Sequence, residues 1–146
     1  MTKTILFAAD YSPASLQALH FAASLARDND ATLLIAHVVE TEGSAGTDSL
    51  DEGSGPSEAQ LKELQGVVPT GVPIPCEYKL LYGNPANKIA ELAERENVDT
   101  IVICAHGHTR LGHLLGGSVA EAVMCQALCA VIAFKPARHV RAAEAL

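Results

Sequence analysis

Short apolar runs alternate with segments of helical periodicity from one end of this sequence to the other. Five runs of strand length recur, over residues 4–9, 31–39, 76–82, 100–104 and 130–134. Strands that are this uniformly apolar are covered on both faces, which is typical of a parallel sheet whose crossover connections are helices. The alternation therefore predicts an α/β fold, a doubly wound five-stranded parallel sheet with helices on both faces.

The helical segments carry their own start signals. Ser12 can cap the first helix through its hydroxyl, and Pro13 then stands at the first helical position, where its missing N–H costs nothing. Core-facing positions at helical spacing follow at Leu16, Leu19, His20, Ala23 and Ala26. We therefore expect this helix to end near Arg27. Three more helices are expected over about 57–65, after Pro85 and over about 118–127.

Length and composition favour one packed domain. The chain has 146 residues, of which 49% are hydrophobic and 18% are charged, so it can bury a core of its own. We expect the domain to span residues 1–136 and to be followed by an unstructured C-terminal tail over 137–146. Within the domain, the polar and glycine-rich stretch 41–56 is expected to be a loop.

Charge and cysteine content indicate which binding partners and which cellular compartment to expect. Ten basic against seventeen acidic residues give a net charge of −7, which argues against binding to nucleic acid or to an anionic membrane. The N-terminus has five consecutive apolar residues, 5–9, fewer than a secretory signal or a membrane span needs. The four cysteines form no C-x-x-C pair, and we expect Cys125 and Cys129 to be small buried apolar side chains. These features predict a cytoplasmic protein without membrane insertion.

Candidate binding groups follow two of the strands. In an open α/β sheet, ligands bind beyond the carboxyl ends of the strands, where the strand order reverses. Asp10 comes directly after the first strand, and a loop with four glycines, 105–118, follows the fourth. Ser118 and Glu121 match a capping box, so a helix N-terminus with exposed N–H groups would lie behind this loop. The pattern fits an anion site and fits an ordinary glycine-rich turn before a capped helix equally well. It is not a P-loop, and no dinucleotide fingerprint follows the first strand.

Several short segments, taken together, resemble the universal stress protein family. They are the opening Ile5 to Ser12 (ILFAADYS), His37-Val38 at the end of the second strand, Gly83-Asn84-Pro85 before a helix, Asp99 to Ile103 (DTIVI), and His106-Gly107 followed after nine residues by Gly117-Ser118. The resemblance covers the chain from Lys3 to about Lys135.

The resemblance implies the strand order 3-2-1-4-5, a homodimer formed through the last strand, and a regulatory or stress-response domain. The implied ligand is ATP or another adenine nucleotide, with or without Mg²⁺, in the cleft between strands 1 and 4. The implied nucleotide-binding residues are Ala8, Ala9, Asp10, Val38, Ile103, Cys104, Gly107, His108, Arg110, Gly117, Ser118, Val119 and Ala120. Of these, Asp10 and Val38 would line the adenosine pocket, and Gly107, Gly117 and Ser118 would hold the phosphates.

The sequence departs from the family's ATP-binding pattern, G-x-x-G followed after nine residues by G-[ST]. Cys104 stands at the first glycine position, so a side chain would reach toward the ribose or the phosphates. Ala9 stands where a Thr or Ser is common. His108 and His113 replace basic residues of the loop, although Arg110 remains. These departures leave open a second function, a homodimeric interaction protein of the same fold that binds no nucleotide and recognises a protein partner unknown from sequence.

Other chemistry has weaker support. His106, His108 and His113 lack the fixed ligand spacing of a zinc site. Protonation of His108 and His113 at about pH 6.5 would make anion affinity depend on pH. Asp10 has no second acidic residue fixed beside it, so we assign no catalytic residue and expect slow ATP hydrolysis at most. We expect Cys104 to be a buried thiol at a strand end, although a redox role stays open.

Overall fold

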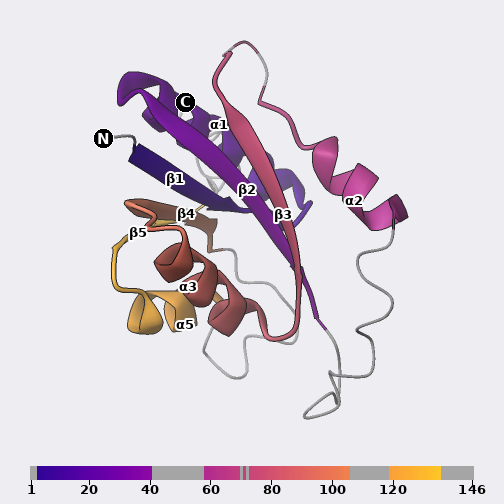
Figure 1. Ribbon diagram of the computed structural model, residues 1–146, viewed down its shortest axis with the longest axis vertical. Helices are drawn as coiled ribbons and strands as arrows, with labels where there is room; N and C mark the ends of the chain where they lie inside the picture. Colours follow the sequence, from indigo (N-terminus) through magenta and orange to yellow (C-terminus); the bar gives the residue numbers. More distant parts are fainter. Residues whose placement is uncertain (1–2, 41–57, 70, 72, 106–118, 136–146) are drawn as a thin grey trace, which may run out of the picture.

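A single parallel sheet organises the part of the chain that the computed structural model describes, residues 3–40, 58–69, 71, 73–105 and 119–135. The strand order is β3-β2-β1-β4-β5, and each neighbouring pair runs parallel (Figure 1). The strands are β1 (Lys3–Ala8), β2 (Ala31–Val39), β3 (Cys76–Tyr82), β4 (Thr100–Cys104) and β5 (Ala130–Phe134). The predicted fold class and the implied strand order are both confirmed. The predicted loop 41–56 and the predicted tail 137–146 lie outside the described residues.

The helices of the described segments cover both faces of the sheet. They are α1 (Pro13–Asp28), α2 (Glu58–Gln65), α3 (Pro85–Arg95) and α5 (Val119–Gln126). α1 and α3 begin in the same way, with a capping side chain followed by proline. The Ser12 hydroxyl oxygen accepts the N–H of Ser15, and the Asn84 side-chain oxygen accepts the N–H of Asn87. None of the helices described is both long enough and apolar enough to cross a membrane.

Alternating side chains along the strands divide the core into two parts. One part, called the α1 core here, contains Ile5 and Phe7 of β1 together with Leu64 of α2. The other, called the α3 core, contains Leu6 of β1 and Ile89 of α3. In Figure 1, α3 and α5 stand in front of the sheet and α1 stands behind it. Because successive side chains of a strand point to opposite faces, β1 contributes to both parts.

The buried stripe of α1 differs from the predicted one. Small residues dominate it: Ser15, Ala18, Leu19, Ala22, Ala23 and Ala26. The prediction is right for Leu19, Ala23 and Ala26. It is wrong for Leu16, which is 52% exposed, and for His20, which is also exposed. Alanine side chains let the helix approach the sheet closely, so the buried face is centred on them and not on the larger side chains.

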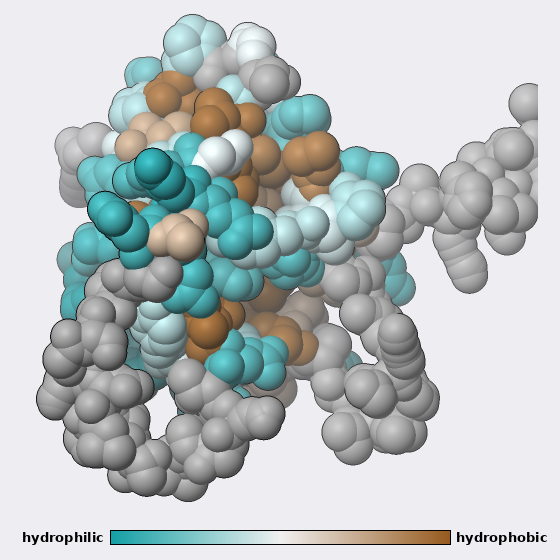
Figure 2. Space-filling view, turned by 90° about the vertical axis from the view of Figure 1, so that its right-hand side faces the viewer, coloured by the Kyte–Doolittle hydropathy of each residue, from teal (hydrophilic) through white to brown (hydrophobic). Residues whose placement is uncertain are grey.

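The outer strands are less buried than the inner ones. β3 and β5 carry mainly half-buried side chains, whereas most side chains of β2 and β4 are buried. Two tyrosines of β3 make hydrogen bonds to α2 and to the segment after it. The Tyr82 hydroxyl donates to Gln60 Oε1 over 2.7 Å. The Tyr78 hydroxyl donates to the Val67 carbonyl over 3.0 Å. Figure 2 faces this side of the molecule, where apolar residues reach the surface between polar ones.

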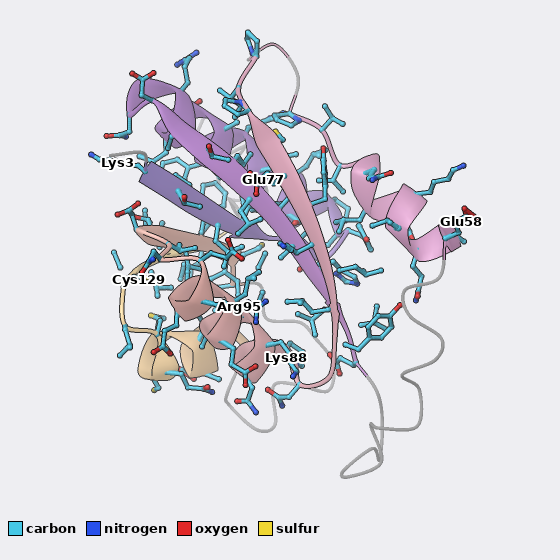
Figure 3. All side chains as sticks on the ribbon, viewed as in Figure 1. Lys3, Glu58, Glu77, Lys88, Arg95 and Cys129 are labelled. Atoms are coloured by element: carbon cyan, nitrogen blue, oxygen red, sulfur yellow. The ribbon has the colours of Figure 1, made fainter. Side chains whose placement is uncertain are left out.

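The four cysteines differ in burial. Cys104 is buried as expected, Cys76 and Cys129 are half-buried, and Cys125 is exposed. The expected burial of Cys125 is therefore wrong, because this residue stands on an outward-facing position of α5. Figure 3 shows Cys129 in the connection between α5 and β5. Burial raises the pKa of the Cys76 and Cys129 thiols, which keeps both in the less reactive protonated form.

Candidate functional site

The strand order reverses between β1 and β4, and the chain leaves these two strands toward opposite faces of the sheet. β1 is followed by α1, which packs on the α1 core, while the next described element after β4 is α5, which packs against α3. The register between the two strands ends at the pair Ala8 and Ile103. We call the region beyond this pair the switch point, since this is where open α/β sheets bind their ligands.

β2 extends past the end of β1 and brings Val38 to the switch point. The N–H of Ala9 donates to the carbonyl of Ala36 over 2.7 Å, and β2 then continues to Val39, pairing with β3 on its other side. Backbone polar groups of a strand alternate between its two neighbours, so the N–H and C=O of Val38 point to the same side as those of Ala36. The Val38 side chain itself lies in the α3 core. Val38 therefore presents its backbone beyond the end of β1.

Asp10 shapes the turn from β1 into α1. Its Oδ1 accepts two hydrogen bonds from Ser12, one from the backbone N–H over 2.9 Å and one from the hydroxyl over 2.7 Å. The Ser12 hydroxyl oxygen accepts in turn the N–H of Ser15, 3.1 Å away. A carboxylate at a helix N-terminus is stabilised by the helix dipole, by about 0.3–1 kcal/mol. These contacts fix the orientation of the carboxylate although Asp10 is exposed.

Tyr11 occupies a strained position in the same turn. Its φ is 63°, in the left-handed region, where a non-glycine residue costs about 1–2 kcal/mol. Its ring lies against the imidazole of His37, with the ring centroids 4.4 Å apart. The Nδ1 atom of His37 lies 2.7 Å from the carbonyl oxygen of Ala9, and since a carbonyl only accepts, Nδ1 carries the donated proton. His37 packs near the end of β2. No signal in the sequence singles out Tyr11, because a positive φ at tyrosine has no sequence signature.

α2 also lies near this turn. Partial burial and the negative charge of Glu63, a residue of α2, raise the pKa of Tyr11. The phenol therefore stays neutral throughout the physiological pH range. The turn that carries Asp10 and Tyr11 is thus bordered by α1, by the end of β2 and by α2.

The other predicted residues at the ends of β1 and β4 are packed against the core. Ala9 and Cys104 are buried in the α1 core, and Ile103 is buried in the α3 core, against which the half-buried Ala8 also packs. Cys104 is 8% exposed, and Phe134 of β5 packs against the same core. This burial argues against the steric conflict with a ligand that the place of Cys104 in the glycine pattern suggests.

Part of the predicted site lies outside the described residues. This part comprises Gly107, His108, Arg110, Gly117 and Ser118, together with His106 and His113. Of the predicted residues on α5, Ala120 is buried and Val119 is 40% exposed. Among the residues that the structure does describe, no three His, Cys, Asp or Glu side chains come together as a metal site would require.

The chain matches the model of the universal stress protein family over residues 1–135. It belongs to this family. It is 40% identical over 139 residues to universal stress protein A homolog 1 of Coxiella burnetii, a match that covers 90% of this chain and 94% of that protein. It is 34% identical over 143 residues to a universal stress protein of Methanocaldococcus jannaschii, covering 91% of this chain and 82% of that protein. The resemblance drawn from the sequence motifs is confirmed.

Solved structures of universal stress proteins share the fold. The protein UspA from Lactobacillus plantarum has a TM-score of 0.66 at 27% identity, over 90% of this chain and 97% of that one. A universal stress protein in complex with cAMP has a TM-score of 0.71 at 23% identity, over 93% and 98% of the two chains. One from Archaeoglobus fulgidus in complex with dAMP has a TM-score of 0.57 at 21% identity, over 91% and 97%. At the last two identities the likeness shows the fold alone.

Proposed function

We propose that this universal stress protein domain binds an adenine nucleotide at the switch point, as a regulatory signal and not as a fuel. The observation that carries the proposal is the extension of β2 past the end of β1, which brings the backbone of Val38 close to the turn that holds Asp10. Two proteins of the same fold form complexes with adenine nucleotides, cAMP and dAMP, which supports this ligand class.

The groups at the switch point suit the parts of a nucleoside. The N–H and C=O of Val38 form an adjacent donor and acceptor, which match a ring nitrogen and the exocyclic amine on one edge of adenine. Ala8 and Ala9 have small side chains, so a base can approach the backbone closely. The carboxylate of Asp10, already oriented by Ser12, would accept a hydrogen bond from a ribose hydroxyl. Guanine presents a carbonyl in place of the amine, so it would bind more weakly.

The phosphate groups would bind at the loop after β4 and at the N-terminus of α5. Backbone N–H groups at such a terminus attract anions, and basic side chains of the loop add positive charge. The residues proposed for this part are Gly107, His108, Arg110, Gly117, Ser118, Val119 and Ala120, while Ile103 and Cys104 support the end of β4. The proposed physiological ligand is ATP, with or without Mg²⁺. No residue is assigned to catalysis, and ATP hydrolysis would be slow at most.

We also propose that the domain forms a homodimer through β5 and works in the cytoplasmic stress response. β5 is an edge strand with half-buried side chains, and Leu128, shortly before it, is 81% exposed. An edge strand presents backbone groups that can pair with a second copy. The same surface favours the second candidate function, a dimeric interaction protein that binds a protein partner without any nucleotide.

The nucleotide content of the purified protein tests the proposal. The protein is denatured, the supernatant is separated by ion-exchange chromatography, and ATP and GTP are then titrated by calorimetry. We expect bound adenine nucleotide, and an affinity for ATP about tenfold or more above that for GTP, because guanine would leave a hydrogen bond unmade. Asp10→Ala should weaken ATP binding about tenfold. Glu77→Ala, which removes an exposed carboxylate from the outer strand β3, is the matched control and should leave the affinity unchanged (Figure 3).

Two results would overturn the proposal. The first is a protein that carries no nucleotide and gives no heat with millimolar ATP, which would favour the dimeric interaction protein. The second is equal affinity for ATP in Asp10→Ala, in Glu77→Ala and in the parent protein, which would place the nucleotide elsewhere on the molecule.

A further inference from the structure

Tyr11 and His37 pack against each other beside the residues proposed to bind the nucleotide. Tyr11 directly follows Asp10, and His37 directly precedes Val38. Their ring centroids are 4.4 Å apart, with an angle of 40° between the ring planes. The pair therefore connects the β1–α1 turn with the end of β2, the two backbone segments that the proposed site uses.

His37 also makes a hydrogen bond between these two segments. Its Nδ1–H donates to the carbonyl of Ala9 over 2.7 Å. The N–H of Ala9 donates to the carbonyl of Ala36, so in a continued parallel ladder the Ala9 carbonyl would accept the N–H of Val38. The imidazole thus supplies a donor to Ala9 at the point where β1 leaves the sheet. Because the Ala9 carbonyl already accepts a hydrogen bond from His37, it does not need the N–H of Val38 as a donor. The N–H of Val38 is then available to a ligand.

The backbone conformation of Tyr11 needs support of this kind. Its φ of 63° lies in the region that favours glycine, and a residue with a large ring stays there when its surroundings hold it in place. Backbone strain of this type concentrates at ligand sites. The two contacts of His37, with Tyr11 and with Ala9, hold the residues on either side of Asp10.

We propose that His37 is a positioning residue of the nucleotide site. Its Nδ1–H takes the place of the Val38 N–H on the Ala9 carbonyl, and its ring supports Tyr11, so that the Asp10 carboxylate and the Val38 backbone are held ready for the ligand. This role rests on the proposed function, since it concerns the same site.

Three variants of His37 separate its hydrogen bond from its ring. His37→Asn keeps a side-chain N–H close to the position of Nδ1, His37→Phe keeps a ring without a donor, and His37→Ala keeps neither. His20→Ala, which removes an exposed histidine from α1, is the matched control. ATP affinity is measured by calorimetry, and thermal unfolding is measured without nucleotide, so that lost stability can be told from lost affinity.

We expect His37→Ala, which loses both the donor and the ring, to weaken ATP binding about tenfold or more. His37→Phe loses only the donor, so it should weaken ATP binding less. His37→Asn loses only the ring, so it should also weaken ATP binding less than His37→Ala does, and His20→Ala should match the parent protein. Unchanged affinity in His37→Ala overturns the proposal. So does an equal loss in His37→Asn and His37→Ala, since the donor then has no effect.

A parent protein that does not bind ATP would overturn the proposed function, and the role of His37 would then be decided without nucleotide. Amide resonances of Asp10 and Tyr11 report on the β1–α1 turn, which is distant from position 37 in the sequence. We expect them to shift more in His37→Ala than in His37→Asn, because both variants lose the ring and only His37→Ala also loses the donor to Ala9. Equal spectra of these amides in the parent protein and in His37→Ala would show that His37 does not position the turn.

Discussion

Two turns of this domain, β1–α1 and β3–α3, follow the same plan but differ in the residue that adopts a positive φ. In each turn a residue with positive φ precedes the N-cap, and proline follows the cap: Tyr11, Ser12 and Pro13 in the first, Gly83, Asn84 and Pro85 in the second. Gly83 adopts a φ of 131° without a side chain to strain. Tyr11 adopts a φ of 63° with an aromatic ring attached.

The difference supports the proposed role of the β1–α1 turn in the ligand site. The β3–α3 turn follows an outer strand, whereas the β1–α1 turn lies at the switch point. Glycine at position 11 would relieve the strain, but it would also remove the ring that lies against His37. The β1–α1 turn keeps a strained residue and the β3–α3 turn avoids one. Since backbone strain concentrates at ligand sites, this difference is consistent with a ligand site at the β1–α1 turn.

The largest effect on stability is expected from Gly83→Val. No L-residue tolerates this φ well, and a Cβ at position 83 would come within 3.0 Å of the Lys88 side chain, at the start of α3 (Figure 3). We expect the free energy of unfolding, measured by urea denaturation, to fall by about 3 kcal/mol while ATP affinity stays unchanged. A loss of ATP affinity in the folded variant would remove the functional distinction between the two turns.

The two capping residues provide a matched pair of smaller changes. Ser12→Ala and Asn84→Ala each remove an N-cap, so each should lower the free energy of unfolding by about 1 kcal/mol. Ser12→Ala also removes the hydroxyl that donates to Asp10, while the bond from the backbone N–H remains. Ser12→Ala alone should therefore weaken ATP binding, by about threefold to tenfold. Equal ATP affinities in the two variants would mean that Ser12 does not orient the Asp10 carboxylate for the ligand.

The smallest effect on stability is expected from Tyr11→Gly. Relief of about 1–2 kcal/mol of strain is offset by the lost ring contact, about 0.5–1.5 kcal/mol, and by the flexibility of glycine in the unfolded chain, about 0.5–1 kcal/mol. The free energy of unfolding should therefore change by about 0.5 kcal/mol or less, while ATP affinity falls. Tyr11→Phe, which keeps the ring, is the control. A stabilised Tyr11→Gly protein with full ATP affinity would show that the strain serves no ligand.

Much of the fold could be predicted because its signals are local. Apolar runs bounded by turn residues give the strands β2, β3, β4 and β5 with the bounds found, and an N-cap followed by proline marks the start of α1. The position of Asp10 at the switch point follows from its place after β1 and from the strand order implied by the family resemblance.

The features that could not be predicted depend on contacts between distant segments. The buried face of α1 excludes Leu16 because alanines lie closest to the sheet, and helical spacing alone does not reveal this. Cys125 is exposed because its neighbours in space decide which face of α5 is covered. The positive φ of Tyr11 is supported by the contact with His37 on β2. The two residues are distant in the sequence, so no local pattern predicts this contact.

A titration with ATP followed by two-dimensional amide NMR tests the central claim most directly, because it observes both turns in one experiment. The account predicts that the largest shifts occur at Asp10, Tyr11, Ser12 and Val38. Gly83, whose N–H donates to the carbonyl of Val39, and Asn84 should shift less. Shifts confined to the β3–α3 turn, or no shift at any of these residues in millimolar ATP, would contradict it.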